Sequence, residues 1–464
     1  MIKGLRLVYR AVTISALGLV LLLAPSLPAQ AAYPGDNGVI VVSSDHSSNN
    51  RQLYSVTADG SVITQLTEEL DGWGEAQDPQ YDPQGKKIAF RRGPEFLMLA
   101  NADGSNEELI AVGEYGAQSP TWSLDSLYIA YINLTSESPA YKLMVKSSLN
   151  TDPGEVVYES DAISDLSWSP DGSQIAFSSV DESFNQHIYL LDLTDGSVTQ
   201  LTNGTGEREP SWSPAGTQIT YTGWDGDSEI FVIDSDGTDN IQLTTNTFSD
   251  QHPAWSPDGS KIAFEANRVT DVNCTVGSCM ELYTMNSDGN NQVRLSNNNS
   301  KTYESPDWRP SNVPSYVYRF WSDQKRHHFY TSSFDEAAYV VQNYTDSEWR
   351  LEGIAYRAYD AADCGSESPV YRFWSDTYQG HFYTISAAEK DYVLSHYPSN
   401  VWRYEGQAFC ANTTQVSGTL PLYRFWSDEY KGHFYTTSEV EKQNVINDYP
   451  DNIWRYEGVA YFVR

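Results

Sequence analysis

The side chains best suited to bind a ligand belong to an aromatic motif that occurs three times near the C-terminus. Each copy contains a tryptophan and, seven residues later, a histidine: Trp321 and His328, Trp374 and His381, Trp426 and His433. A flat indole face can stack on a sugar ring while polar neighbours orient that ring. The three tryptophans are therefore candidates for contact with a carbohydrate, although most of the surrounding aromatic residues are expected in the core.

The same histidines could converge on a metal ion if the three copies surround an axis, because imidazole is a common zinc ligand. A histidine repeated beside arginine and glutamate is more often an internal hydrogen-bonding group. We favour that interpretation. No metal or other cofactor is predicted there, and the histidines are kept only as candidates for ligand contact.

A second group of potential ligands is acidic. Asp225, Asp227 and Glu229 offer three carboxylates at a spacing that calcium could use. The run lacks the complete loop pattern of an EF-hand. A solvated acidic loop is therefore the favoured interpretation, with Ca²⁺ as the alternative.

Sequence motifs of catalysis are missing from the chain. It contains no Gly-x-Ser-x-Gly nucleophile elbow, no His-Glu-x-x-His zinc motif and no phosphate-binding glycine loop. Its 62 acidic residues leave paired carboxylates open, and such pairs can cleave glycosidic bonds. The sequence favours a non-catalytic protein, with a carbohydrate-active lyase or glycoside hydrolase as the alternative.

Six copies of a longer repeat occupy the first two thirds of the chain. Each centres on an aromatic anchor that precedes a turn; the anchors are Tyr81, Trp122, Trp168, Trp212, Trp255 and Trp308. They are separated by 41, 46, 44, 43 and 53 residues, which is the period of a four-stranded propeller blade. In such a blade the tryptophan anchors pack between sheets, and Asp-Gly turns close the hairpins because they tolerate positive φ.

The two ends of this array predict how the ring closes. Segments 39–42, 52–56 and 65–67 have the pattern of the second to fourth strands of a blade, and the last anchor, Trp308, has no strand after it. One split blade built from both ends would remove the free sheet edges. We therefore expect a six-bladed β-propeller over residues 32–312, closed by N- and C-terminal strands.

The run Trp-Ser-Pro-Asp-Gly-x-x-Ile-Ala-Phe at 168–177 and 255–264 resembles the WD40-like repeat of TolB-type propellers. The resemblance extends over the whole array of six copies. It implies a binding platform with a central channel, whose loop faces dock protein partners in the bacterial envelope. A protein or peptide is therefore the expected partner of the propeller.

Residues 313–464 contain the three aromatic copies, in units of about 316–359, 369–410 and 421–464. Each unit has the pattern of two strands, a helix that opens with a capping box, and a final strand. One unit is too small to bury a core, so we expect the three ββαβ units to form a single small α+β domain around a pseudo-threefold axis. The repeat resembles one of unknown function at the C-termini of many exported bacterial proteins, which implies an accessory module.

Charge and the N-terminus limit the partners and the location. The formal charge of −33 argues against nucleic acid, because phosphate binding needs a basic surface. Residues 1–31 have the basic, apolar and Ala29-Gln30-Ala31 parts of a secretory signal, and no later run is long enough to span a membrane. A secreted or periplasmic bacterial protein is predicted. In that compartment we expect two disulfides, Cys274 with Cys279 and Cys364 with Cys410.

Together these features predict a mainly β, exported, non-catalytic binding protein. Its propeller would dock a protein or peptide partner. Its C-terminal repeats would bind polysaccharide of the cell envelope or the extracellular space.

Overall fold

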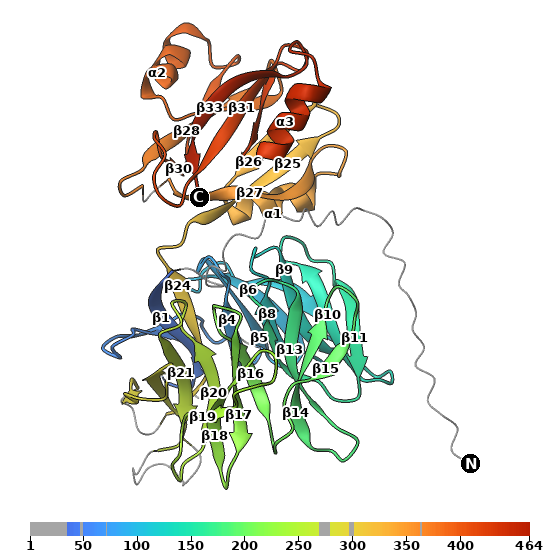
Figure 1. Ribbon diagram of the computed structural model, residues 1–464, viewed down its shortest axis with the longest axis vertical. Helices are drawn as coiled ribbons and strands as arrows, with labels where there is room; N and C mark the ends of the chain where they lie inside the picture. The colour runs from blue at the N-terminus through green and yellow to red at the C-terminus, as the bar shows by residue number, and fades with distance from the viewer. Residues whose placement is uncertain (1–34, 47–49, 71, 269–278, 297–300, 362–363) are drawn as a thin grey trace, which may run out of the picture. The chain divides into compact units, whose positions relative to one another are not determined.

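The computed structural model describes residues 35–46, 50–70, 72–268, 279–296, 301–361 and 364–464. The expected signal segment, 1–31, lies outside the described residues. Among the helices that are described, none is long and apolar enough to cross a membrane. The described chain is mainly β, with six four-stranded antiparallel sheets followed by three ββαβ units (Figure 1).

The six sheets are the blades of a propeller, and we number them in chain order from the N-terminus. Blade 1 contains β24 (Tyr303–Ser311), β1 (Asp36–Ser44), β2 (Gln52–Val56) and β3 (Ile63–Gln65). Blade 2 contains β4 (Ala76–Tyr81), β5 (Lys87–Arg92), β6 (Phe96–Asn101) and β7 (Glu108–Val112). Blade 3 contains β8 (Gly116–Trp122), β9 (Tyr128–Leu134), β10 (Tyr141–Ser147) and β11 (Glu155–Ser160).

The other three blades repeat this order without interruption by another sheet. Blade 4 contains β12 (Ser164–Trp168), β13 (Gln174–Val180), β14 (Gln186–Asp192) and β15 (Val198–Gln200). Blade 5 contains β16 (Arg208–Trp212), β17 (Gln218–Trp224), β18 (Ser228–Asp234) and β19 (Ile241–Gln242). Blade 6 contains β20 (Asp250–Trp255), β21 (Lys261–Ala266), β22 (Glu281–Asn286) and β23 (Val293–Arg294).

Blade 1 is the split blade that the sequence predicted. Strand β24, near the end of the propeller, pairs antiparallel with β1 at its beginning, and Ile40 lies opposite Trp308 (Figure 1). Both side chains are buried in one hydrophobic cluster with Val42 and Tyr54. The expected closure by N- and C-terminal strands is therefore confirmed, and the blade has no open edge at the junction.

The turn after the innermost strand shows why the repeat needs its Ser-Pro-Asp-Gly sequence. In blade 4 the Asp171 carboxylate accepts hydrogen bonds from the Ser169 hydroxyl at 2.7 Å and from the Ser173 backbone N–H at 3.0 Å. Gly172 then has a φ of 77°, a conformation in which glycine has no side-chain penalty. The turn sends the chain back along β13.

The three ββαβ units have nearly identical bounds. The first contains β25 (Ser315–Ser322), β26 (His327–Thr331), α1 (Phe334–Asn343) and β27 (Arg350–Asp360). The second contains β28 (Ser368–Ser375), β29 (Gly380–Thr384), α2 (Ala387–His396) and β30 (Arg403–Ala411). The third contains β31 (Leu420–Ser427), β32 (Gly432–Thr436), α3 (Glu439–Asp448) and β33 (Arg455–Val463).

A cyclic set of tyrosine hydrogen bonds joins the three units. Tyr330, Tyr383 and Tyr435 occupy the same position in their units and are almost completely buried. The Tyr330 hydroxyl donates to the Tyr435 carbonyl, Tyr383 donates to Tyr330, and Tyr435 donates to Tyr383, at 2.8, 2.6 and 3.1 Å. The closed cycle defines the expected pseudo-threefold axis and shows that the units share one core.

The first ββαβ unit also shares a hydrophobic cluster with the propeller. Tyr316 and Phe334 are buried with Trp122 and Leu127 of blade 3. Residues Ala31–Arg464 accordingly form one compact unit. The division into domains at 312/313 stays a prediction from the sequence repeats.

Candidate binding site at the propeller channel

The innermost strand of every blade carries a residue with left-handed backbone conformation at the same place. These residues are Ser305, Asp78, Ser119, Asp165, Glu209 and His252, with φ between 50° and 58°. None is glycine, the residue that adopts this conformation without strain. The strand register shifts at each of these positions, so every one lies in a β-bulge.

The six bulges define a ring of side chains at one end of the propeller channel. All six residues line a cavity of about 110 Å³. Bulges redirect side chains and are common beside functional sites. Non-glycine residues that are held in a strained backbone conformation also point to function. The ring is therefore the candidate site.

The charged members of the ring come mainly from blades 4 to 6 and interact with one another. Glu209 accepts a hydrogen bond from the His252 backbone N–H at 2.9 Å and one from the Thr222 hydroxyl at 2.7 Å. The His252 Nδ1 lies 2.8 Å from Glu265 Oε1, and its Nε2 lies 3.4 Å from Glu209 Oε1. Asp165 interacts electrostatically with Glu209 and His252.

Burial and neighbouring charge set the protonation of this group. Burial and then the charge of Glu209 raise the pKa of Asp165. Burial alone would raise the pKa of Glu209, but the positive charges of His252 and Arg208 lower it below its ordinary value. Burial alone would lower the pKa of His252, yet Glu209 and Glu265 raise it well above its ordinary value. The protonated form of His252 is therefore favoured by the two glutamates on either side of it.

Two carboxyl groups of the split blade change charge near neutral pH. Burial and the charge of Glu265 raise the pKa of Glu304 to about 7, against the opposing effect of Arg51. The Arg51 guanidinium lies 2.7 Å from the Glu304 carboxylate. Burial raises the pKa of Asp307 to about 7 as well. The charge on the channel wall therefore depends on pH around neutrality.

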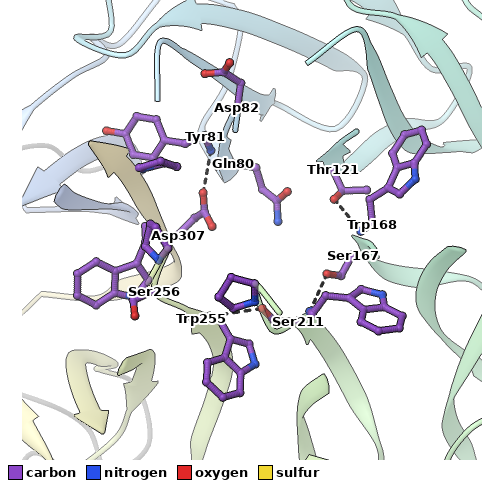
Figure 2. A pocket seen from close by; sticks show the side chains of 15 residues that line it. Gln80, Tyr81, Asp82, Thr121, Ser167, Trp168, Ser211, Trp255, Ser256 and Asp307 are labelled. Carbon is purple, nitrogen blue, oxygen red and sulfur yellow. Dashed lines mark hydrogen bonds between the residues drawn. The ribbon is translucent and has the colours of Figure 1, made fainter. Parts of the chain in front are cut away.

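Farther along the channel, hydrogen bonds connect inner strands of neighbouring blades (Figure 2). In four places a polar side chain accepts the backbone N–H of the aromatic anchor in the next blade: Asp307 from Tyr81 at 2.8 Å, Thr121 from Trp168 at 3.1 Å, Ser167 from Trp212 at 3.1 Å, and Ser211 from Trp255 at 3.5 Å. Figure 2 shows the indoles of Trp168 and Trp255 pointing away from the opening. The anchors are therefore packing residues, as expected, and small polar side chains line this part of the channel.

Among the exposed aromatic side chains of the propeller, Phe184 and Trp224 lie where the second strands of two neighbouring blades end. Phe184, in the loop between β13 and β14, is 86% exposed and has a φ of 62°, and Trp224, at the end of β17, is 54% exposed. The Asp181 carboxylate orders the first loop by accepting the backbone N–H groups of Ser183 at 2.7 Å and Asn185 at 2.9 Å. An exposed aromatic side chain on an ordered, strained loop is typical of a binding surface.

These loops lie at the same end of the channel as the ring. Ser164 pairs with Ser178 in blade 4, which places the loop after β13 beside the bulge of β12, and the register of blade 5 is equivalent. The stretch 147–260 contains 20 aspartates and glutamates, and Arg208 is its single lysine or arginine. We call the ring together with the loops 181–185 and 224–227 the acidic mouth.

Comparison with known families agrees with this architecture. Residues 91–223 match the TolB beta propeller domain, and residues 275–398 and 317–464 match a domain of unknown function, DUF5648. The chain carries a TolB-type propeller and DUF5648 repeats. Both family resemblances that the sequence motifs suggested are confirmed. No curated protein matches the chain.

Solved structures similar to the TolB-type propeller have low sequence identity to it. TolB from Agrobacterium tumefaciens is 18% identical with a TM-score of 0.45, and covers 59% of this chain and 99% of its own. TolB from Acinetobacter baumannii is 20% identical with a TM-score of 0.47, covering 59% and 67%. An oligogalacturonate lyase from Vibrio parahaemolyticus is 16% identical with a TM-score of 0.39, covering 57% and 77%. These similarities say nothing about the ligand of this chain.

The three calcium candidates do not converge on one point in the TolB-type propeller. Asp225 is exposed at the tip of the β17–β18 hairpin, whereas Glu229 is buried and accepts the Asn246 backbone N–H at 2.7 Å. Burial raises the pKa of Glu229. Within the described ranges no three His, Cys, Asp or Glu side chains, Asp227 included, form a group that could hold a metal ion.

Each candidate tryptophan of the DUF5648 repeats is half-buried and belongs to the same polar arrangement. The indole Nε1 of Trp321, Trp374 and Trp426 donates to Asp323, Asp376 and Asp428 at 2.7, 2.7 and 2.8 Å. The same carboxylates lie 3.5, 3.6 and 3.2 Å from the guanidinium groups of Arg350, Arg403 and Arg455. The repeats therefore present three equivalent sets of an indole, a carboxylate and a guanidinium.

The candidate histidines lie behind these tryptophans. The ring centroids of each Trp–His pair are 4.7 to 4.8 Å apart. The Nε2 atoms of His328, His381 and His433 lie 3.3 to 3.4 Å from a glutamate of the same unit, and burial lowers the pKa of each. They are internal hydrogen-bonding groups, which leaves the tryptophans as the more exposed members of the pairs.

One of the two expected disulfides can be examined. Cys364 and Cys410 are bonded, with Cα atoms 5.3 Å apart, and connect the two ends of the second DUF5648 unit. The other expected pair includes Cys274, which lies outside the described residues.

Sequence reasoning missed the ring of left-handed residues. Five of its six members directly precede a proline, and each of those prolines lies two residues before an aromatic anchor. Proline restricts the backbone of the preceding residue, so this repeated X-Pro pair was an available signal. The identity of the X residues, which include acids and a histidine, would then have pointed to the channel.

Proposed function

We propose that the TolB-type propeller is a non-catalytic binding platform whose acidic mouth docks a basic segment of a protein partner. Cationic side chains of that segment would pair with carboxylates around the ring. Apolar side chains beside them would contact Phe184 and Trp224. Charge complementarity of this kind speeds association and selects partners of the opposite sign.

The observation that carries this proposal is the ordered, exposed Phe184 loop beside an almost purely acidic pair of blades. An aromatic residue with 86% of its surface in water contributes nothing to the core. Its loop is nevertheless ordered by Asp181 and held with a left-handed φ at Phe184. Preorganisation lowers the entropy cost of binding, so the loop fits a role as an anchor point for a partner.

The same proposal places the protein outside the cytoplasm, either secreted or in the periplasm. It is supported by the signal-like segment 1–31 and by the disulfide between Cys364 and Cys410, since disulfides persist in oxidising compartments. The partner would be a protein of the cell envelope or of the medium.

A selection experiment tests the docking proposal. Random dodecapeptides displayed on phage are selected on the full chain, and selected peptides are then measured against the double variant Phe184→Ser/Trp224→Ser. We expect enrichment of Lys and Arg beside apolar residues, and at least tenfold weaker binding by the double variant. Ile241→Ser is the matched control, because Ile241 lies in blade 5 and is also 54% exposed, but it is on the outermost strand.

Selected peptides without basic residues, or equal binding by the double variant, would refute the docking proposal. The alternative function, a propeller enzyme acting on polysaccharide, has a different signature. An enzyme of this kind would depolymerise a polysaccharide with saturable kinetics, and the variant Glu209→Gln would lose the activity. If that activity is observed, the enzyme function replaces the binding proposal.

For the DUF5648 repeats we propose glycan binding as an accessory function. The support is the triple occurrence of a half-buried indole flanked by a carboxylate and a guanidinium, since an aromatic face with polar neighbours suits a sugar ring. Three equivalent sites would raise the avidity for a repetitive polysaccharide without any additional contact. The triple variant Trp321→Ala/Trp374→Ala/Trp426→Ala should then lose binding to polysaccharide.

A further inference from the structure

The turns between the first two strands of the DUF5648 units form a second surface, which borders the three tryptophan sets. In each unit the turn between the repeated Ser-Asp and the repeated histidine varies in sequence, and two of its residues precede His327 or the equivalent glycine. The pairs are Lys325-Arg326 in the first unit, Tyr378-Gln379 in the second and Tyr430-Lys431 in the third. We call these six residues the axial turns.

Each axial turn is held rigidly by a buried serine. The hydroxyl groups of Ser322, Ser375 and Ser427, which are fully buried, accept the backbone N–H of the first residue of each pair at 2.9 to 3.0 Å. The carbonyls of the same serines accept the N–H of the second residue at 2.8 to 2.9 Å. The side chains that follow are therefore presented from fixed backbone positions.

The second residue of each pair has a strained backbone conformation. Arg326, Gln379 and Lys431 have φ values of 57°, 58° and 58°. Glycine or asparagine would adopt this conformation at less cost. Three long polar side chains occupy the positions instead, and all three are exposed. All three units have a strained backbone at this position and place there a side chain that can form hydrogen bonds. This points to a binding role.

The axial turns converge on the pseudo-threefold axis. His327, which follows the first turn, lies against Gly380 and Gly432, the equivalent residues of the other units. The Lys325 Nζ is 5.4 Å from the centroid of the Trp374 ring, and the Arg326 guanidinium is 5.5 Å from that of Tyr430. Buried His327 fills the space at the axis, and the aromatic and cationic side chains of the turns lie around it.

The cations of this site are available to a ligand. Within the part of the chain that the structure describes, Lys325, Arg326 and Lys431 form no ion pair with a carboxylate. Lys325 instead lies over the Trp374 ring, and Arg326 lies over the Tyr430 ring and donates from one guanidinium nitrogen to the Tyr430 hydroxyl at 3.4 Å. The other N–H groups of the two side chains can still bind an anion.

We infer that the axial turns bind the carboxylate group of an acidic sugar within a polysaccharide. This inference rests on the proposed glycan-binding function and names the class of glycan. The Arg326 guanidinium and the Lys431 ammonium would hold the carboxylate by charge-assisted hydrogen bonds. Gln379 would bond to ring hydroxyls, and Tyr378 and Tyr430 would contact the sugar face.

The arrangement favours an acidic sugar over other anions. The whole chain carries a charge of −33, which repels every polyanion, so local contacts at the axial turns must select the ligand. A polyuronate carries one charge per sugar and offers flat apolar faces between the charges. Tyrosine side chains beside isolated cations match that alternation.

The test compares hexagalacturonate with its methyl ester, because esterification removes the charge and keeps the sugars. Binding of each to the full-length chain is measured by titration calorimetry at low salt. We expect the ester to bind at least tenfold more weakly. Arg326→Gln/Lys431→Gln should weaken hexagalacturonate binding at least tenfold. This variant should fold, because Gln379 already occupies the equivalent position with the same φ.

A matched control removes the same charge from elsewhere in the repeats. Lys390→Gln/Lys442→Gln changes two helix lysines away from the axial turns and should bind hexagalacturonate within twofold of the unaltered chain. Equal binding of the ester, no effect of Arg326→Gln/Lys431→Gln, or equally tight binding of hexaglutamate would each overturn the inference.

The accessory glycan-binding function can fail separately. If neutral cellohexaose binds in a manner that depends on the three tryptophans and hexagalacturonate binds no better, only the acidic-sugar inference is wrong. If no oligosaccharide binds to the chain, both proposals are wrong.

Discussion

Single residues at the axis distinguish the three DUF5648 units from one another. The first unit has His327 where the other two have glycine, and the imidazole occupies the space beside both glycines. Burial is the main reason that the pKa of His327 is lowered to about 4, so the ring is neutral at physiological pH. One histidine thus fills a space that three symmetric glycines would leave open.

This packing predicts a strong coupling between Gly432 and His327. A Cβ at position 432 would overlap with the His327 imidazole, so Gly432→Ala should lower the free energy of unfolding by about 1–3 kcal/mol. In the His327→Gly background the same alanine has room and should cost much less. Urea unfolding of the two single variants and the double variant measures the coupling. Additive effects would show that the imidazole does not occupy that space.

At the channel, Asp307 predicts a dependence of stability on pH. Its pKa is about 7 in the folded chain against 3.8 ordinarily, so between these values the folded state binds the proton more tightly than the unfolded state. Stability should therefore fall as pH rises from about 4 to 7. Above pH 7 the penalty for the ionised carboxyl is complete.

Asp307→Asn should remove that penalty while its amide oxygen still accepts the Tyr81 backbone N–H. The variant should match the unaltered chain at pH 4 and be more stable by about 1–3 kcal/mol at pH 8, a range that allows for partial exposure to solvent. Thermal unfolding at both pH values measures the difference, with the exposed Glu155→Gln as control. A difference that is the same at pH 4 and pH 8 would contradict the assignment.

At the scale of the element, the three helices show which features local sequence determines. Ser333, Ser386 and Ser438 are N-caps, each accepting the backbone N–H of the glutamate three residues later, as the capping boxes predicted. Glu336 and Glu389, however, accept a hydrogen bond from a threonine just before the cap. The local pattern predicted where the helices begin, but not that these glutamates would bind a threonine hydroxyl.

The helices differ in how much they depend on their caps. Helix α1 buries four side chains, whereas α3 buries none. Ser438→Ala should therefore accelerate amide hydrogen exchange of α3 by several-fold to thirtyfold, equivalent to about 1–2 kcal/mol of local stability. Ser333→Ala is the matched control in α1, where packing should limit the acceleration. Equal acceleration in both helices would show that packing does not hold α1.

Strands and turns of the propeller were predictable for a physical reason, whereas the bulges left only the weaker signal of the X-Pro pairs. Asp-Gly turns and aromatic anchors act through local backbone preferences and burial, which leave a repeated sequence pattern. The bulge at Asp165 or Glu209 depends on how the strand is paired with its neighbour. The alternation of apolar and polar residues along one strand does not show this pairing. The acids of the ring therefore looked like ordinary surface residues in the sequence.

At the scale of the whole molecule, the closure of the propeller determines where its negative charge gathers. The split blade makes the propeller continuous, and the strand register then places acidic loops of different blades around one opening. Sequence composition showed that the chain is acidic, but only the structure shows that blades 4 and 5 collect carboxylates beside Phe184 and Trp224. The central claim is that this mouth binds a basic segment.

A charge-swap binding measurement tests that claim most directly. Glu182→Lys/Asp225→Lys reverses two exposed carboxylates of the acidic mouth, and Glu108→Lys/Glu155→Lys reverses two exposed carboxylates on outermost strands of blades 2 and 3. The dissociation constant of one lysine- and arginine-rich peptide from the selection is measured for the unaltered chain and both variants, at 50 and 300 mM NaCl.

The account predicts that the mouth variant binds at least tenfold more weakly, that the control variant stays within about threefold, and that salt weakens binding to the unaltered chain. Equal loss in both variants would mean that only net charge attracts the peptide. Unchanged binding by the mouth variant would contradict the account.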